Sequence, residues 1–144
     1  MIRFRYAALP LTLLAGLAGG YALAQQNTPT ASAEVLLTTD KTILGQPFAY
    51  PITDAPQVTA AIVTLPPGAE TGWHHHDVPL FGYILEGELT VTYEAAGEKL
   101  YRSGDALMEA LGTPHNGRNE TSEPIRILAV FIGAEGVPNS VKAQ

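Results

Sequence analysis

Short apolar segments alternate with turn residues from Glu34 onward, at the roughly 8–12-residue spacing that is typical of all-β barrels and sandwiches. No segment after residue 25 combines apolar residues at helical spacing with caps at both ends. The pattern predicts one antiparallel β domain over residues 34–144 with little helix. The candidate strands are Val35–Thr38, Phe48–Tyr50, Val58–Leu65, Leu80–Leu85, Leu89–Tyr93, Lys99–Arg102, Ala106–Glu109 and Ile125–Ile132.

The segment Ile84-Leu85-Glu86-Gly87-Glu88-Leu89 joins two of these candidate strands with almost no intervening chain. Glycine adopts positive φ without the steric cost that a Cβ imposes, and tight hairpin turns require such a residue. The sequence therefore predicts a tight hairpin with Gly87 at the turn.

The first 24 residues have the composition of a secretory signal. Arg3 and Arg5 precede an uncharged apolar run, Tyr6–Tyr21, and Ala22-Leu23-Ala24 provides a small-x-small cleavage site. An uncleaved membrane anchor is the alternative, but the position of the small residues favours cleavage after residue 24. We therefore expect a periplasmic or secreted protein with no stable membrane span after cleavage. Residues 25–33 are polar and lack apolar periodicity, which predicts a disordered lead-in.

Charge and composition narrow the possible functions. The chain has 144 residues, which suits a single domain, and carries 14 acidic against 8 basic residues, for a net charge of -6. No cluster of lysine or arginine follows residue 5, so nucleic-acid binding is disfavoured. Cysteine is absent, which rules out thiolate ligands, disulfides and a cysteine nucleophile.

Three of the four histidines are consecutive, within Gly72-Trp73-His74-His75-His76-Asp77. On a strand, residues i and i+2 share a face, so His74 and His76 would point one way and His75 the other. Two histidines on one face can chelate a metal, and a third from a distant segment would complete a set that leaves coordination positions open. A polar surface loop with a chance histidine run is the alternative interpretation.

Two spaced sets of residues resemble the two conserved motifs of the cupin superfamily. The first set is Gly68-(five)-His74-x-His76-(ten)-Gly87, against the family pattern G-x5-H-x-H-x3 or 4-E-x6-G. The second is Gly104-(seven)-Gly112-(two)-His115-(three)-Asn119, against G-x5-P-x-G-x2-H-x3-N. The resemblance implies a double-stranded β-helix, the cupin or jelly-roll barrel, whose mouth binds a divalent metal through His74, His76 and His115.

The chain departs from the family pattern at two positions. Leu80 stands where the first motif has its glutamate, or Phe81 if the longer spacing applies, so the usual carboxylate ligand is missing. We expect these two side chains to form an apolar wall in its place. Ala110 replaces the proline of the second motif, a change that affects the turn and not the chemistry.

Three further polar residues in or beside the motifs have expected roles. Glu109 is the one carboxylate of the second motif that could turn toward His115. It is the candidate catalytic residue, as metal ligand or general base, and an exposed or structurally hydrogen-bonded role is the alternative. Asp77 is expected to cap a turn, and Asn119 to bond the backbone of the following loop. Strand parity alone does not say which face of 106–109 points inward.

Three neutral imidazoles would leave the +2 charge of a divalent metal uncompensated, which favours anionic ligands. Nitrogen ligation suits Zn, Fe, Ni or Cu. We therefore expect binding of a small, anionic organic molecule, and the alternative is a metal-dependent enzyme, a dioxygenase, isomerase or lyase, acting on a small organic acid. A homodimer is expected, because exposed edge strands need cover.

Overall fold

The computed structural model describes residues 30–94 and 96–143. The expected signal segment, 1–24, and residues 25–29 of the expected lead-in lie outside this part, so export stays a prediction that N-terminal sequencing of the mature protein would test. Residues Glu34–Gln144 form a compact unit of their own. The described part contains no helix, and hence none that could cross a membrane.

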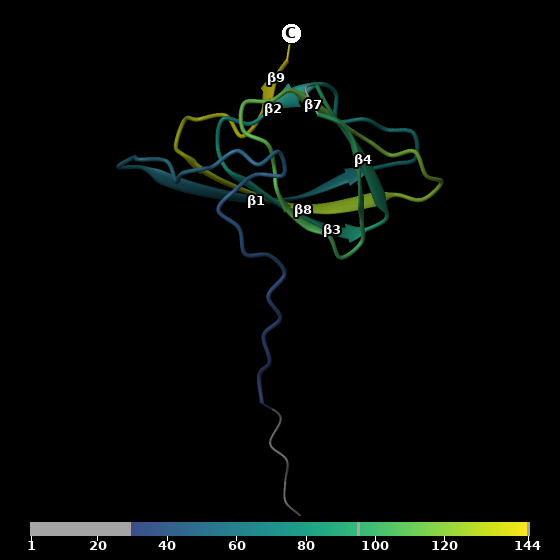
Figure 1. Ribbon diagram of the computed structural model, residues 1–144, viewed down its shortest axis with the longest axis horizontal. Helices are drawn as coiled ribbons and strands as arrows, with labels where there is room; N and C mark the ends of the chain where they lie inside the picture. The colour runs from purple at the N-terminus through teal and green to yellow at the C-terminus, as the bar shows by residue number, and fades with distance from the viewer. Residues whose placement is uncertain (1–29, 95, 144) are drawn as a thin grey trace, which may run out of the picture. The chain divides into compact units, whose positions relative to one another are not determined.

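Two antiparallel sheets make up the fold (Figure 1), which confirms the all-β jelly-roll prediction. One sheet has four strands in the order β1-β8-β3-β6, and the other has five in the order β5-β4-β7-β2-β9. The strands are β1 Pro56–Leu65, β2 His74–His75, β3 Leu80–Glu86, β4 Glu88–Tyr93, β5 Gly97–Arg102, β6 Ala106–Met108, β7 His115–Arg118, β8 Ile125–Ala134 and β9 Val141–Lys142.

Alternation of side chains along the strands directs the apolar residues of both sheets into the space between them. On β3, Leu80, Gly82 and Ile84 are buried, while the residues between them are only partly covered. On β4, Leu89 and Val91 are buried in the same alternating way. Burying a side chain such as Ile84, which is 0% exposed, contributes roughly 1.5–3 kcal/mol. Binary patterning therefore explains why these segments are strands and which face forms the core.

The prediction of a hairpin at Gly87 is wrong, because the strands on either side do not pair with each other. The predicted positive φ of Gly87 is confirmed. Gly87 has φ +84°, as a tight turn requires, but β3 pairs with β6 and β8 while β4 pairs with β5 and β7. The chain therefore turns at Gly87 from one sheet into the other. A Cβ at this position would lie 3.1 Å from the carbonyl oxygen of Pro124 and 3.2 Å from Cα of Ile125, so the corner is both strained and crowded for any other residue.

Two expected strands do not form, and three strands were not expected. The segments Val35–Thr38 and Phe48–Tyr50 contain no strand, and Val35 and Tyr50 are 78% and 69% exposed, because neither segment pairs with a neighbouring strand. The unexpected strands are β2, β7 and β9. These short strands carry histidine, asparagine, arginine and lysine, so apolar alternation does not reveal them.

The outward surface of the four-stranded sheet carries rows of apolar side chains across β1, β8 and β3, which we call the outer face. The rows are Val58 with Ile132, Ala60 with Val130 and Phe81, and Ile62 with Leu128 and Tyr83. Val58 and Ile62 are 64% and 48% exposed, although both are apolar. Charged residues begin only in the next row, at Arg126 and Glu86. Contiguous exposed apolar surface of this kind marks an interaction site.

The homodimer remains a prediction, and the outer face is where we expect the second copy to pack, because an uncharged apolar face can contact itself across a two-fold axis. Sedimentation velocity should show a dimer for the wild type and a monomer for Ile62→Glu. Leu100→Glu is the control, since Leu100 is 44% exposed but lies on β5 of the other sheet. A wild-type monomer at high concentration, or a dimer that Ile62→Glu leaves intact, would rule this interface out.

Candidate metal centre

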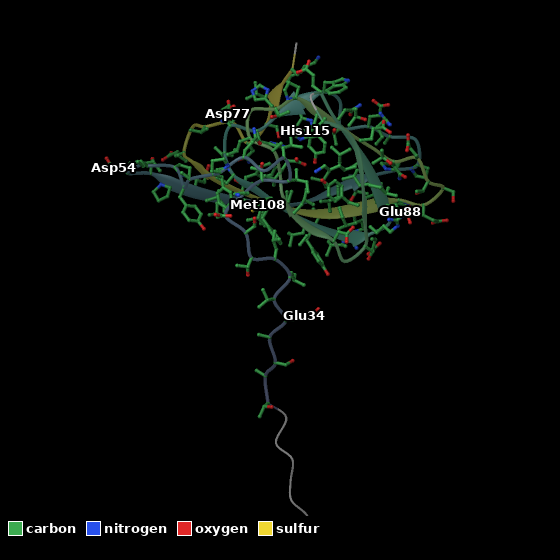
Figure 2. All side chains as sticks on the ribbon, viewed as in Figure 1. Glu34, Asp54, Asp77, Glu88, Met108 and His115 are labelled. Carbon is green, nitrogen blue, oxygen red and sulfur yellow. The ribbon has the colours of Figure 1, made fainter. Side chains whose placement is uncertain are left out.

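The strand register brings His74 and His115 together. β2 pairs with β7 such that His74 lies directly opposite His115, and directly opposite residues of an antiparallel pair project from the same face. His76 follows β2 and returns to the side of His74, as strand parity predicted. The ring centroids are 4.5 Å apart for His74 and His115, 4.9 Å for His74 and His76, and 5.1 Å for His76 and His115. Figure 2 labels His115 near the end of the domain where Figure 1 labels β2, β7 and β9, and its side chain is buried.

Each of the three rings is oriented by a backbone carbonyl. Nδ1 of His74 is 2.8 Å from the carbonyl oxygen of Gly72, Nδ1 of His76 is 2.7 Å from that of Asn139, and Nδ1 of His115 is 2.9 Å from that of Thr113. A carbonyl oxygen only accepts, so each Nδ1 carries the proton and donates it. Each Nε2 is therefore left with a free lone pair, the arrangement that metal-binding histidines use.

The donor set fits a divalent metal. One ligand nitrogen from each of the three histidines lies within 4.8 Å of the others, so a single ion could contact all three. His76 and His115 are each 3% exposed, so two of the three ligand side chains are buried. The three side chains that the two sequence motifs singled out are thus brought to one place, with their metal-binding nitrogens available.

Burial also keeps His74 and His76 neutral. Burial, opposed by the hydrogen bond to the Asn139 carbonyl and assisted by the neighbouring imidazoles, lowers the pKa of His76 to about 4. The pKa of His74 is lowered as well, again mainly by burial. Because only the neutral ring can bind a metal, both side chains are in the ligand form at neutral pH.

The lowered pKa of His76 predicts an acid-sensitive fold in the metal-free protein. In the unfolded chain His76 has a pKa of 6.5, so it takes up a proton at a higher pH than in the folded chain, where its pKa is about 4. Its contribution to the free energy of unfolding is therefore fully present above pH 6.5 and is lost as the pH falls toward 4. The loss should reach about 3 kcal/mol. Urea unfolding of metal-free protein at several pH values should show this fall reduced in His76→Asn and retained in His75→Asn; equal pH profiles would contradict it.

His75 lies outside the cluster. It is opposite Val141 in the register of β2 with β9, and its Nε2 is 3.4 Å from Oδ1 of Asp77. Neither His75 nor Asp77 lines the cavity described below. The expectation that His75 points away from the other two histidines agrees with this placement.

Glu109, the candidate catalytic residue, lies inside the barrel directly after β6 and is 7% exposed. One carboxylate oxygen, Oε1, accepts a hydrogen bond of 2.7 Å from the backbone N–H of Ala110. The other, Oε2, is 3.9 Å from Nε2 of His115. Glu109 is therefore buried beside the histidine cluster, while its hydrogen bond to Ala110 is one that a structural role would also make. Its catalytic role stays a prediction.

A cavity of about 580 Å³ lies between the two sheets and opens at the histidine cluster. Its wall is mainly apolar, with contributions from Leu80, Ile84, Ile127 and Phe131, and Glu109, the residue after β6, also lines it. Leu80 thus forms the apolar wall expected of it. Phe81 does not, because it is the next residue along β3 and projects onto the outer face, opposite Val130.

Several residues of the site escaped the sequence analysis. Tyr93 is buried beside His115, with ring centroids 5.6 Å apart, and its hydroxyl is 3.0 Å from that of Tyr101. Burial, followed by the charge of Glu109, raises the pKa of Tyr93. Alternation with Leu89 and Val91 could have predicted that Tyr93 faces inward. Lys142, which lines the cavity from β9, follows no apolar pattern and gave no such signal.

Asn119 performs the structural role expected of it. Its Nδ2 donates to the carbonyl oxygens of Leu65 and Glu123, at 2.9 and 2.8 Å. Its Oδ1 accepts from the backbone N–H and the hydroxyl of Thr121, at 2.9 and 2.8 Å. Asn119 is 2% exposed and ties β1 to the loop that enters β8.

Comparison with known proteins extends these observations. A family model described as the cupin domain matches residues 61–131, a range that includes the histidine cluster and Glu109. Among curated proteins, oryzines biosynthesis cluster protein J of Aspergillus oryzae (strain ATCC 42149 / RIB 40) is 32% identical over 78 residues, which are 54% of this chain and 42% of that protein. The chain therefore spans less than half the length of this relative.

Solved structures share the barrel. DMSP lyase DddQ from Ruegeria pomeroyi DSS-3 superposes with a TM-score of 0.53 and 26% identity, over 69% of this chain and 47% of that one. The Lactobacillus farciminis oxalate decarboxylase formate complex gives a TM-score of 0.52 and 22% identity, over 59% and 26% of the two chains, and shows the likeness of fold alone. With the two motifs, the jelly-roll topology and the matching family model, this chain belongs to the cupin family.

Proposed function

We propose that the protein is a metal-dependent cupin enzyme that binds a small organic anion and transfers a proton to or from it. His74, His76 and His115 would hold one divalent transition metal through Nε2, and Zn, Fe, Ni and Cu are the ions that suit imidazole ligands. When bound, the metal supplies Lewis-acid chemistry and, because the three ligands are neutral, retains its full charge for an anionic group of the substrate.

The cavity supports a small organic substrate. Its volume of about 580 Å³ falls within the range of roughly 300–1,000 Å³ that is usual for ligand pockets. Its apolar wall would contact the carbon skeleton, while the histidine cluster and Glu109 provide the few polar groups that fix orientation. Such a combination is expected for a substrate that has an anionic end and a short hydrocarbon portion.

The observation that carries the enzymatic proposal is the buried carboxylate of Glu109 in the cavity wall. Because Oε1 accepts the N–H of Ala110, the carboxylate is held with Oε2 toward the cluster, 3.9 Å from Nε2 of His115. A positioned carboxylate of this kind can take a proton from a substrate carbon at Oε2 and return it. The likeness to a DMSP lyase, at 26% identity, supports a lyase more than passive binding.

Glu109→Gln tests this role. Glutamine keeps the shape and the acceptor for Ala110 but cannot accept a proton at the second position, so proton transfer should fall by about 10²- to 10⁴-fold while metal content stays the same. The assay is proton NMR of metal-loaded protein in D₂O with a panel of small carboxylates, which detects both consumption and hydrogen–deuterium exchange at carbon.

Glu123→Gln is the matched control, because Glu123 is exposed and does not line the cavity. Unchanged exchange in Glu109→Gln would refute the role of Glu109. If the protein converts none of the carboxylates in the panel, but some of them raise its melting temperature, the non-enzymatic alternative holds. In that alternative the cavity binds a small anion without turnover.

A further inference from the structure

A single row of residues crosses the five-stranded sheet at the level of the histidine cluster. The register places Tyr93 opposite His115, His115 opposite His74, and His74 opposite Lys142. Residues directly opposite one another in antiparallel strands project from the same face. His74, His115 and Lys142 line the cavity, while Tyr93 is buried beside His115. Lys142, on β9, therefore lies next to His74 at the edge of the histidine cluster.

Lys142 gives this edge of the cavity a charge of its own. Of the described residues that line the cavity, Lys142 is the one lysine or arginine and Glu109 the one carboxylate. Within residues 30–94 and 96–143, none of the ion pairs includes Lys142. An ammonium group on a four-carbon stem can turn toward an anion in the cavity mouth, where the nearby apolar wall strengthens the attraction.

The position of Lys142 is tied to the position of the histidines. Asn139, three residues earlier, accepts the hydrogen bond from Nδ1 of His76, and the hydroxyl of Ser140 lies 3.2 Å from the same nitrogen. On the other side, the backbone N–H of Ala143 donates to the carbonyl oxygen of Trp73, at 3.0 Å. The segment that carries Lys142 is thus fixed at both ends to the segment that carries His74 and His76.

We propose that Lys142 forms an anion subsite that selects short dicarboxylates: one carboxylate of the ligand binds at the histidine cluster, and the other pairs with the ammonium of Lys142. This inference rests on the proposed function and specifies its substrate class. A monocarboxylate of similar length would bind only at the histidine cluster. A dicarboxylate would also accept a charge-assisted hydrogen bond from Lys142. Specificity then depends on the spacing between the two anionic groups.

Isothermal titration calorimetry with propionate, malonate, succinate and glutarate tests the subsite. The proteins are the wild type, Lys142→Met, Lys142→Arg and Lys41→Met, each loaded with Zn²⁺ and also metal-free. Lys41 is the control, because it is exposed and does not line the cavity. For at least one dicarboxylate, we expect the Zn²⁺-loaded wild type to bind more tightly than it binds propionate.

Lys142→Met should lower the affinity for that dicarboxylate by about 10- to 100-fold and leave the affinity for propionate unchanged. Lys142→Arg should keep part of the dicarboxylate affinity, because it retains the positive charge. The inference is overturned if Lys142→Met weakens propionate equally, if it changes nothing, or if the loaded wild type binds no dicarboxylate more tightly than propionate. If Zn²⁺ does not bind but dicarboxylate affinity still depends on Lys142, the metal proposal fails and the subsite stands.

Discussion

Replacing His74, His76 or His115 by alanine is expected to weaken metal binding by at least about 100-fold, whereas His75→Ala should change it little. Each of the three removes a ligand nitrogen that the structure aims at a common point, while His75 lies outside the cluster. Even changes to groups that merely orient metal ligands cost about 10- to 100-fold in affinity, so loss of a ligand should exceed this.

The measurement is metal content by mass spectrometry of protein purified from its native host, followed by titration of each variant with Zn²⁺. His75→Ala is the matched control, because it removes the same side chain from the same histidine run. Equal losses in all four variants would show that the run chelates metal as an unstructured loop, and the metal centre described above would have to be abandoned.

The second large effect is expected for Asn119→Ala, which should destabilise the fold by about 3 kcal/mol. The substitution removes the four side-chain hydrogen bonds of Asn119 and leaves the buried carbonyl of Leu65 without this donor. Leaving a buried polar group without its partner costs about 1–3 kcal/mol, and the upper end is expected here because several partners lose the same side chain. The midpoint of urea unfolding should therefore fall, with no change in the slope of the transition.

Asn139→Ala serves as the comparison for this variant. Asn139 contributes its backbone carbonyl to His76, which alanine retains, and its side chain takes part in no hydrogen bond among the described residues. It should unfold close to the wild type. A similar midpoint for Asn119→Ala and the wild type would mean that water replaces the lost donors, contrary to the burial of this side chain.

Sequence pattern predicted the longer apolar segments, and these are the strands that build the core. Val58–Leu65 and Leu89–Tyr93 lie within β1 and β4, whose inward residues, such as Val91, are mostly apolar. Val35–Thr38 is also mainly apolar but forms no strand, because β structure also needs a pairing partner that local sequence does not specify.

The metal centre was harder to predict from sequence pattern than the strands were. The parity of His74 and His76 followed from one short segment, but the third histidine came only from family resemblance, because its proximity depends on the long-range register of β2 with β7. The same applies to Lys142, which becomes a neighbour of His74 through β9. Glu109 was identified as a candidate, yet its inward orientation required the structure, since strand parity allows either face.

The carbonyl contact of His76 also links the metal centre to the last strand of the sheet. Asn139 accepts the hydrogen bond from the His76 ring and lies two residues before β9, which carries Lys142. Detaching this segment would free the His76 ring to rotate and lower the affinity for metal. By thermodynamic reciprocity, a bound metal would hold this segment in place by the same free energy. Metal binding and the local stability of one short stretch of chain are therefore linked.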